Sequence, residues 1–133
     1  MIKLKQLITE SLKDMVFSKS IKPKHKKRMG IETKLFPSNP NLSMTPPPAN
    51  DSNETRTELF KLLAYNDGVI DRPMVEKYDN LTKPYMELIE KYNVDVTEDD
   101  IQQIIDEGAK FTLKIKYKYN RPRPYQIAEH YGI

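Results

Sequence analysis

The chain has 133 residues, of which 38% are hydrophobic and 31% are charged, and its formal net charge is +3. This length allows one small domain, and the absence of cysteine excludes disulfide bonds, thiolate metal sites and a cysteine nucleophile. The chain has only two histidines, His25 and His130, which are too few for most histidine-based metal or catalytic sites. No apolar run is long enough for a membrane span or a secretory signal, so we expect a soluble, cytoplasmic protein.

The charge is distributed unevenly along the chain. Residues 1–34 contain ten lysines and arginines against three acidic residues, a balance of +7. The other 99 residues contain twelve basic and sixteen acidic residues, a balance of −4. This asymmetry predicts an arm followed by a body. We place an amphipathic helix and a basic, proline-rich arm in residues 1–53, and a helical body in residues 54–133.

The predicted arm begins with apolar residues near helical spacing in residues 2–15, which indicate a short amphipathic helix. A basic run, KPKHKKR, follows at Lys22–Arg28, and residues 36–53 are rich in proline. The whole of 16–53 is expected to be an extended linker without a packed core of its own. The basic run is interpreted either as a solubilising segment or as a nucleic-acid contact.

The predicted body contains helical patterns and no sustained alternation of the kind that marks strands. The first helix is expected over residues 55–66, with a stop at Asp67-Gly68. The second covers 71–92, where Pro84 predicts a kink or two shorter helices. The third runs from an N-cap at Thr97 to Tyr119. The fold class is therefore all-α, a partial helical bundle preceded by an extended, proline-rich N-terminal arm.

Helical geometry assigns faces to the third helix. The face expected to be buried carries Ile104, Ile105, Gly108, Phe111, Thr112, Ile115 and Tyr119. The opposite face, expected in solvent, carries Gln103, Glu107, Lys110, Lys114 and Lys118. Lys116 falls at the margin of the apolar face, where an ammonium needs an anionic partner. Arg123 follows seven residues later in a proline-restricted turn, and lysine with arginine suits the binding of phosphate oxygens.

The segment KYKYNRPRPY resembles the first signature, K-x6-R-P, of the type 2 phosphatidic acid phosphatase/vanadium haloperoxidase superfamily. Lys116, Arg123 and Pro124 match the signature, with Arg121 at the frequent second arginine and Tyr125 at the aromatic position. A second register, Lys114 with Arg121-Pro122, also satisfies the bare pattern, but its context fits less well. The helices before the motif are similar to soluble bacteriophage members, and the opening MIKLKQLITESLKD resembles the starts of many phage proteins.

The resemblance implies a helical bundle that binds a phosphoryl group through Lys116 and Arg123, with Arg121 in support and Tyr125 as a substrate contact. It implies hydrolysis of phosphomonoesters through a phosphohistidine. Two further motifs, P-S-G-H and S-R-x-x-x-G-x-H, supply the histidines, and this sequence contains neither. We therefore assign no catalytic residue to this chain and interpret His130 as a surface or packing residue. The matched segment is one motif of three.

The sequence leaves two classes of function open. The first is the phosphate-binding N-terminal portion of a phosphatase, a fragment or split chain whose histidines come from a C-terminal remainder or a second chain. The second is a non-enzymatic phage accessory or structural protein with a nucleic-acid-binding arm, placed in the host cytoplasm or the virion. The first needs no metal or other cofactor, and vanadate would replace phosphate only in a haloperoxidase. Both classes are compatible with a homo-oligomer.

Overall fold

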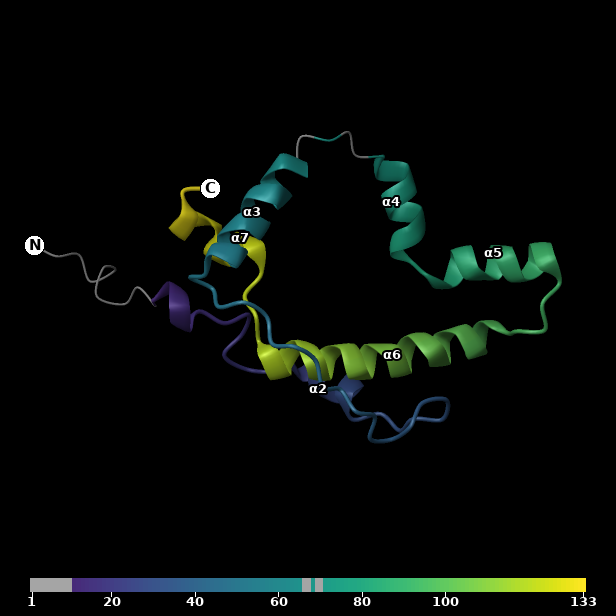
Figure 1. The fold of residues 1–133 in the computed structure, drawn as a ribbon. Helices are drawn as coiled ribbons and strands as arrows, with labels where there is room; N and C mark the ends of the chain where they lie inside the picture. Colours follow the sequence, from purple (N-terminus) through teal and green to yellow (C-terminus); the bar gives the residue numbers. More distant parts are fainter. Residues whose placement is uncertain (1–10, 66–67, 69–70) are drawn as a thin grey trace, which may run out of the picture. The chain divides into compact units, whose positions relative to one another are not determined.

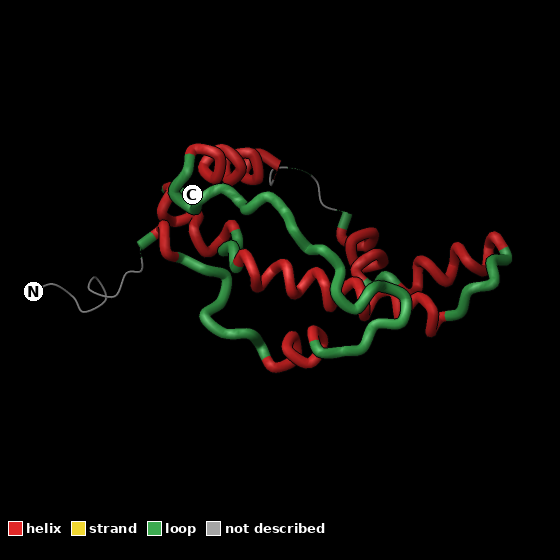
Figure 2. The backbone as a smooth tube through the Cα atoms, turned by 60° about the horizontal axis from the view of Figure 1, so that its bottom comes forward, coloured by secondary structure: helices red, strands yellow, loops and turns green. Residues whose placement is uncertain are grey.

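The computed structural model describes residues 11–65, 68 and 71–133 and contains helices and loops, with no strand in this part of the chain (Figures 1 and 2). The predicted all-α class is therefore confirmed. The elements in chain order are η1 (Leu12–Asp14), α2 (Pro23–Met29), α3 (Asn53–Tyr65), α4 (Arg72–Asp79), α5 (Thr82–Tyr92), α6 (Glu98–Tyr119), α7 (Pro124–Ile127) and η2 (Ala128–Tyr131).

Two compact units make up the chain. Of the described residues, unit 1 combines 11–22, 43–65 and 115–133, and unit 2 combines 23–42, 68 and 71–114. The boundary between Lys114 and Ile115 falls within α6, which continues from one unit into the other. Each unit therefore takes part of the predicted arm and part of the predicted body. The division into 1–53 and 54–133 stays a description of composition and charge.

The arm is less uniform than a linker. Most of the amphipathic helix expected over 2–15 lies outside the described residues, and η1 is its described end. The basic run forms α2, with Pro23 at the first helical position, where its missing N–H is not needed. In unit 1, the Asn50 side-chain amide donates to the carbonyls of Leu12 at 3.0 Å and Met15 at 2.8 Å. These bonds attach the η1 segment to the residues that precede α3.

Helix α3 begins where the sequence offers a cap. The Ser52 hydroxyl accepts the Thr55 N–H at 3.1 Å, and Thr55 is buried with its hydroxyl donating to the Ala49 carbonyl at 2.8 Å. Leu59 of α3 and Ile127 of α7 are buried, with 6% and 2% of their surfaces exposed, and Pro122 is buried beside them in unit 1. Together they form a small core.

Between residues 71 and 92 the chain forms two short helices, as Pro84 predicts. Helix α4 ends at Asp79, and α5 begins at Thr82 with Pro84 in its first turn. A proline is tolerated there because the first N–H groups of a helix have no intrahelical acceptor. Apolar side chains of these two helices, and Leu81 between them, are exposed: Met74, Val75, Tyr78, Leu81, Tyr85, Leu88 and Tyr92.

Helix α6 has the predicted limits. The Thr97 hydroxyl accepts the Asp100 N–H at 3.2 Å, and the Asp100 carboxylate accepts the Thr97 N–H at 2.8 Å. The backbone hydrogen bond from Thr97 and then its hydroxyl lower the pKa of Asp100. At the other end, Asn120 has φ +47°, a left-handed conformation that ends the helix at Tyr119.

The predicted faces of α6 are only partly correct within unit 2: Phe111 is buried as expected, but four other assignments are wrong. Glu107 and Lys110, assigned to solvent, are buried, whereas Ile104 is 46% exposed and Thr112 is exposed. The reason is that the segment 31–36 lies against this side of the helix. Its backbone N–H groups need an acceptor, and the Glu107 carboxylate accepts those of Lys34, Leu35 and Phe36 at 2.5 to 3.1 Å.

Two further contacts hold this segment on α6. The Lys110 ammonium donates to the Ile31 carbonyl, and the Phe36 ring packs edge-on against the Phe111 ring, with centroids 5.9 Å apart. Phe111 and Leu113 are the buried apolar side chains of α6, and Pro84 of α5 is also buried in unit 2. A buried carboxylate and a buried ammonium are thus both paired with backbone groups.

Among the described helices, none combines the length and the apolar content that a bilayer crossing requires.

Candidate anion-binding site

The predicted phosphate ligands lie where the last turn of α6 passes into the segment R-P-R-P. These residues all belong to unit 1. Each arginine precedes a proline, which restricts both to extended backbone. Arg123 has φ −70° and ψ 153°, close to polyproline II geometry, and α7 begins at the next residue. Successive side chains in that geometry point about 120° apart, so Arg121 and Arg123 face different surroundings.

Phe17 is held against the R-P-R-P turn by four hydrogen bonds. The Phe17 N–H donates to the Asn120 carbonyl at 2.9 Å, and the Gln126 amide donates to the Phe17 carbonyl at 3.1 Å. The Asn120 side chain accepts the Ser18 N–H at 3.1 Å and donates to the Ser18 carbonyl at 2.8 Å. Gln126 also accepts the Arg123 N–H at 2.7 Å. The arm and the turn are therefore fixed to each other at residue 17.

Two cations converge on the Phe17 ring. Lys116 Nζ lies 4.1 Å from the ring centroid, and Arg123 Cζ lies 5.4 Å from it. Both distances are within the range of a cation–π interaction, in which the negative face of the ring attracts the charge. The structure thus brings together the lysine and the arginine of the predicted register. They come from different elements and share one half-buried aromatic side chain.

The charge around this ring is uncompensated within the described residues. No carboxylate in the described part of the chain forms an ion pair with Lys116 or Arg123. Burial, followed by the positive charges of Arg123 and Lys22, lowers the pKa of Lys116. Like charges held close together repel each other, and an anion placed between them relieves that repulsion. The arrangement is therefore suited chemically to an oxyanion.

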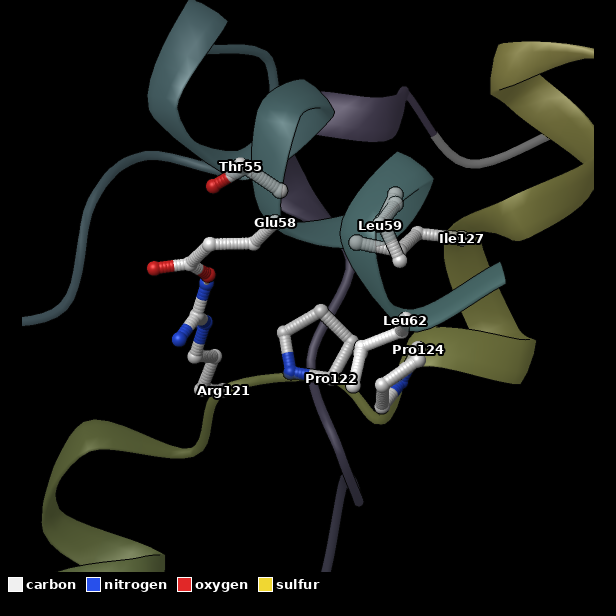
Figure 3. Close-up of a pocket in the computed structure, with 8 residues that line it drawn as sticks. All are labelled: Thr55, Glu58, Leu59, Leu62, Arg121, Pro122, Pro124 and Ile127. Carbon is white, nitrogen blue, oxygen red and sulfur yellow. Dashed lines mark hydrogen bonds and ion pairs between the residues drawn. The ribbon is translucent and has the colours of Figure 1, made fainter. Parts of the chain in front are cut away.

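Arg121 has an anionic partner of its own, although it also lines a hollow together with Lys116, Met44 and Tyr119. Its guanidinium forms an ion pair with Glu58 of α3, and Figure 3 shows the two side chains turned toward each other. They border another hollow, which contains neither Lys116 nor Arg123. Its lining residues are Thr55, Glu58, Leu59, Leu62, Arg121, Pro122, Pro124 and Ile127. Arg121 thus already has an anionic partner, and its supporting role in phosphate binding stays a prediction.

The remaining candidates lie at the surface or farther along α6. Tyr125, predicted as a substrate contact, is 74% exposed. His130 is exposed in η2, which agrees with its interpretation as a surface residue. Lys114, the lysine of the second register, is half-buried two residues before Lys116. No group of three acidic or histidine side chains in the described part of the chain is arranged to hold a metal ion.

Sequence reasoning missed Phe17 and Lys22. Lys22 Nζ lies 5.9 Å from the Phe17 centroid, and its backbone N–H donates to the Tyr117 hydroxyl at 3.4 Å. Ser18 and Asn120, which join the arm to the turn, are 102 positions apart. No local pattern pairs an isolated aromatic residue of the arm with a turn so distant in the chain. The position of Lys22 at the start of the basic run was its only signal.

Comparison of the chain with protein-family models, with curated proteins and with solved structures finds no match.

Proposed function

We propose that this chain is the phosphate-binding portion of a phosphatase, and that it binds a phosphoryl oxyanion between Lys116 and Arg123. The observation that carries the proposal is the convergence of these two cations on the Phe17 ring, without an ion-pairing carboxylate in the described residues. Lysine provides a point charge and arginine a planar fork, the combination that suits phosphate oxygens. The resemblance of KYKYNRPRP to the superfamily signature supports the same two residues.

Hydrolysis is proposed only together with a polypeptide that supplies the histidine motifs. In the family, one histidine attacks phosphorus and another protonates the leaving group, while the lysine and arginine stabilise charge on the phosphoryl oxygens. Lys116 and Arg123 would perform that last task here. His130 and His25 are not in the sequence context of either motif. Alone, the chain is expected to bind phosphate without hydrolysing p-nitrophenyl phosphate.

The test is a calorimetric titration of the full chain with inorganic phosphate and with vanadate, which measures the dissociation constant of each anion. Lys116→Ala and Arg123→Ala are each expected to weaken binding about tenfold or more, because each removes a charge-assisted contact worth about 1.5–3 kcal/mol. Lys114→Ala is the matched control, a lysine of the same helix that belongs to the other register. Unchanged binding in both Lys116→Ala and Arg123→Ala would overturn the proposal, and loss in Lys114→Ala alone would select the other register.

A second candidate function rests on α2. In the described residues, none of the four exposed cations of this helix forms an ion pair with a carboxylate: Lys24, Lys26, Lys27 and Arg28. Such a group is suited to contact the phosphates of a nucleic acid. Binding to duplex DNA should then weaken steeply with salt, and changing the four cations to glutamine should abolish it. Salt-independent binding, or binding that survives this variant, would exclude α2 as the contact.

A further inference from the structure

Lys22 reaches the same ring as the two proposed phosphate ligands. Its Nζ lies 5.9 Å from the Phe17 centroid, where Lys116 Nζ lies at 4.1 Å and Arg123 Cζ at 5.4 Å. Three positive charges from three segments of unit 1 therefore gather around one aromatic side chain. Charges this close are only partly screened, because the Debye length is about 10 Å at 0.1 M salt.

The position of Lys22 is set by a hydrogen bond at its own backbone and by others five residues before it. Its own N–H donates to the Tyr117 hydroxyl at 3.4 Å, and five residues earlier the backbone of Phe17 is bonded to Asn120 and Gln126. The rings of Phe17 and Tyr117 also contact each other, with centroids 6.0 Å apart. Lys22 is exposed, so its ammonium can contact a ligand in solvent.

No described carboxylate forms an ion pair with Lys22 either. Burial, then the positive charge of Arg123 and that of Lys22, lower the pKa of Lys116, which agrees with the short distances of all three cations from the Phe17 ring. A singly charged ligand would leave most of this charge uncompensated. A ligand with two negative charges on a single phosphoryl group balances it better and offers three oxygens to three cations.

We propose that Lys22 is a third anion ligand of this site and that Phe17 is a positioning residue, whose ring holds the three cations near one another. With three cations, the site prefers the dianion of a phosphate monoester to the monoanion of a phosphate diester. This inference rests on the proposed function, because it concerns the same site. It adds a ligand and an aromatic support from the N-terminal arm.

The first experiment measures binding of phenyl phosphate and of dimethyl phosphate to the full chain at pH 8, where the monoester is doubly charged because its second pKa is about 6. Lys22→Gln is expected to weaken phenyl phosphate binding about tenfold, which corresponds to 1.4 kcal/mol, and dimethyl phosphate binding about twofold. Lys19→Gln, which changes an exposed lysine of the same arm, should leave both affinities unchanged.

The outcomes separate the two proposals. If Lys22→Gln binds phenyl phosphate as the wild type does while Lys116→Ala does not, the site has two cations and the third-ligand inference fails, but the proposed function stands. If Lys116→Ala and Arg123→Ala also bind as the wild type does, the proposed function itself fails. Equal losses for the monoester and the diester in Lys22→Gln would overturn the preference for a dianion.

The second experiment tests Phe17. Phe17→Leu removes the ring face and is expected to weaken phenyl phosphate binding about tenfold and to reduce the monoester-to-diester ratio, whereas Phe17→Tyr keeps the face and should bind as the wild type does. A purely structural role would leave the ratio unchanged. Phe17→Leu protein with a wild-type unfolding midpoint and wild-type binding would overturn the positioning role. If that variant does not fold, a loss of binding in Phe17→Tyr, which keeps the ring face, would overturn it.

Discussion

Replacing Glu107 by glutamine preserves the shape of a side chain with 0% of its surface exposed and removes its charge. The carboxylate accepts the N–H groups of Lys34, Leu35 and Phe36 at 2.5 to 3.1 Å and the Gln103 amide at 2.6 Å. Glutamine offers one acceptor oxygen, and its NH₂ group is a donor. One edge of the substituted side chain would therefore direct N–H groups at other N–H groups.

The magnitude follows from counting donors. Whichever way the new amide is turned, at least one backbone N–H loses its acceptor and the amide NH₂ gains none. A buried donor without an acceptor costs about 1–3 kcal/mol, and in a unit of this size each kcal/mol shifts the unfolding midpoint by roughly 4–8 °C. We therefore expect Glu107→Gln to lower the midpoint by roughly 10 °C or more at pH 7.

The effect should depend on pH in a defined direction. Burial acts to raise the pKa of Glu107, but hydrogen bonds from Lys34, Gln103, Phe36 and Leu35 outweigh it and lower the pKa from 4.5 to about 2. A carboxyl group whose pKa is lower in the folded state stabilises the fold above its unfolded pKa. The difference between wild type and variant should thus be constant from about pH 5.5 to 8 and shrink as the pH falls from about 4.5 toward 2.

The assay is thermal unfolding followed by circular dichroism at pH 7 and at pH 3. Asp106→Asn is the matched control, because the Asp106 carboxylate neighbours Glu107 and accepts only an exposed hydrogen bond from Gln102, at 2.9 Å. We expect this control to unfold within about 2 °C of the wild type. Coincident unfolding of Glu107→Gln and wild type at pH 7, or an undiminished difference at pH 3, would refute the reasoning.

The other predictions concern packing, a surface ion pair and a helix cap. Ile127→Ala should destabilise unit 1 by about 2–4 kcal/mol in denaturant unfolding, because the side chain is 2% exposed, whereas the exposed Tyr125→Ala should change stability by less than about 0.5 kcal/mol. A double-mutant cycle on Arg121 and Glu58 should give a coupling below about 1 kcal/mol, since both side chains are partly exposed; a larger coupling would contradict it. Thr97→Ala should destabilise α6 by about 1 kcal/mol, and unchanged helicity and midpoint would show that the cap contributes nothing.

The ends of the helices could be read from the sequence because capping and proline act over a few residues. Thr97 was predicted as the N-cap of α6, and its hydroxyl accepts the Asp100 N–H. Pro84 predicted a kink or two shorter helices, and the helical structure is interrupted between Asp79 and Thr82. Both features depend on backbone groups within one turn, so their outcome does not depend on the rest of the fold.

The buried face of α6 could not be read in the same way. Helical periodicity indicates which residues share a face, and it placed Glu107 with Lys110 correctly. It then assigned that face to solvent because its residues are polar. The segment 31–36, more than 70 positions earlier in the chain, covers the face with unpaired N–H groups, and a carboxylate is what those groups require.

The candidate site shows the same division. The sequence by itself predicted the pair Lys116 and Arg123, from the signature that it resembles and from the helical position of Lys116, which are both local features. Only the tertiary structure decided that Arg121 pairs with Glu58 and that Phe17 and Lys22 join the two cations. Polyproline II backbone turns neighbouring arginines in different directions, but the group each one meets comes from elements distant in the chain. Those partners are selected when the arm, α3 and the end of α6 pack together within unit 1.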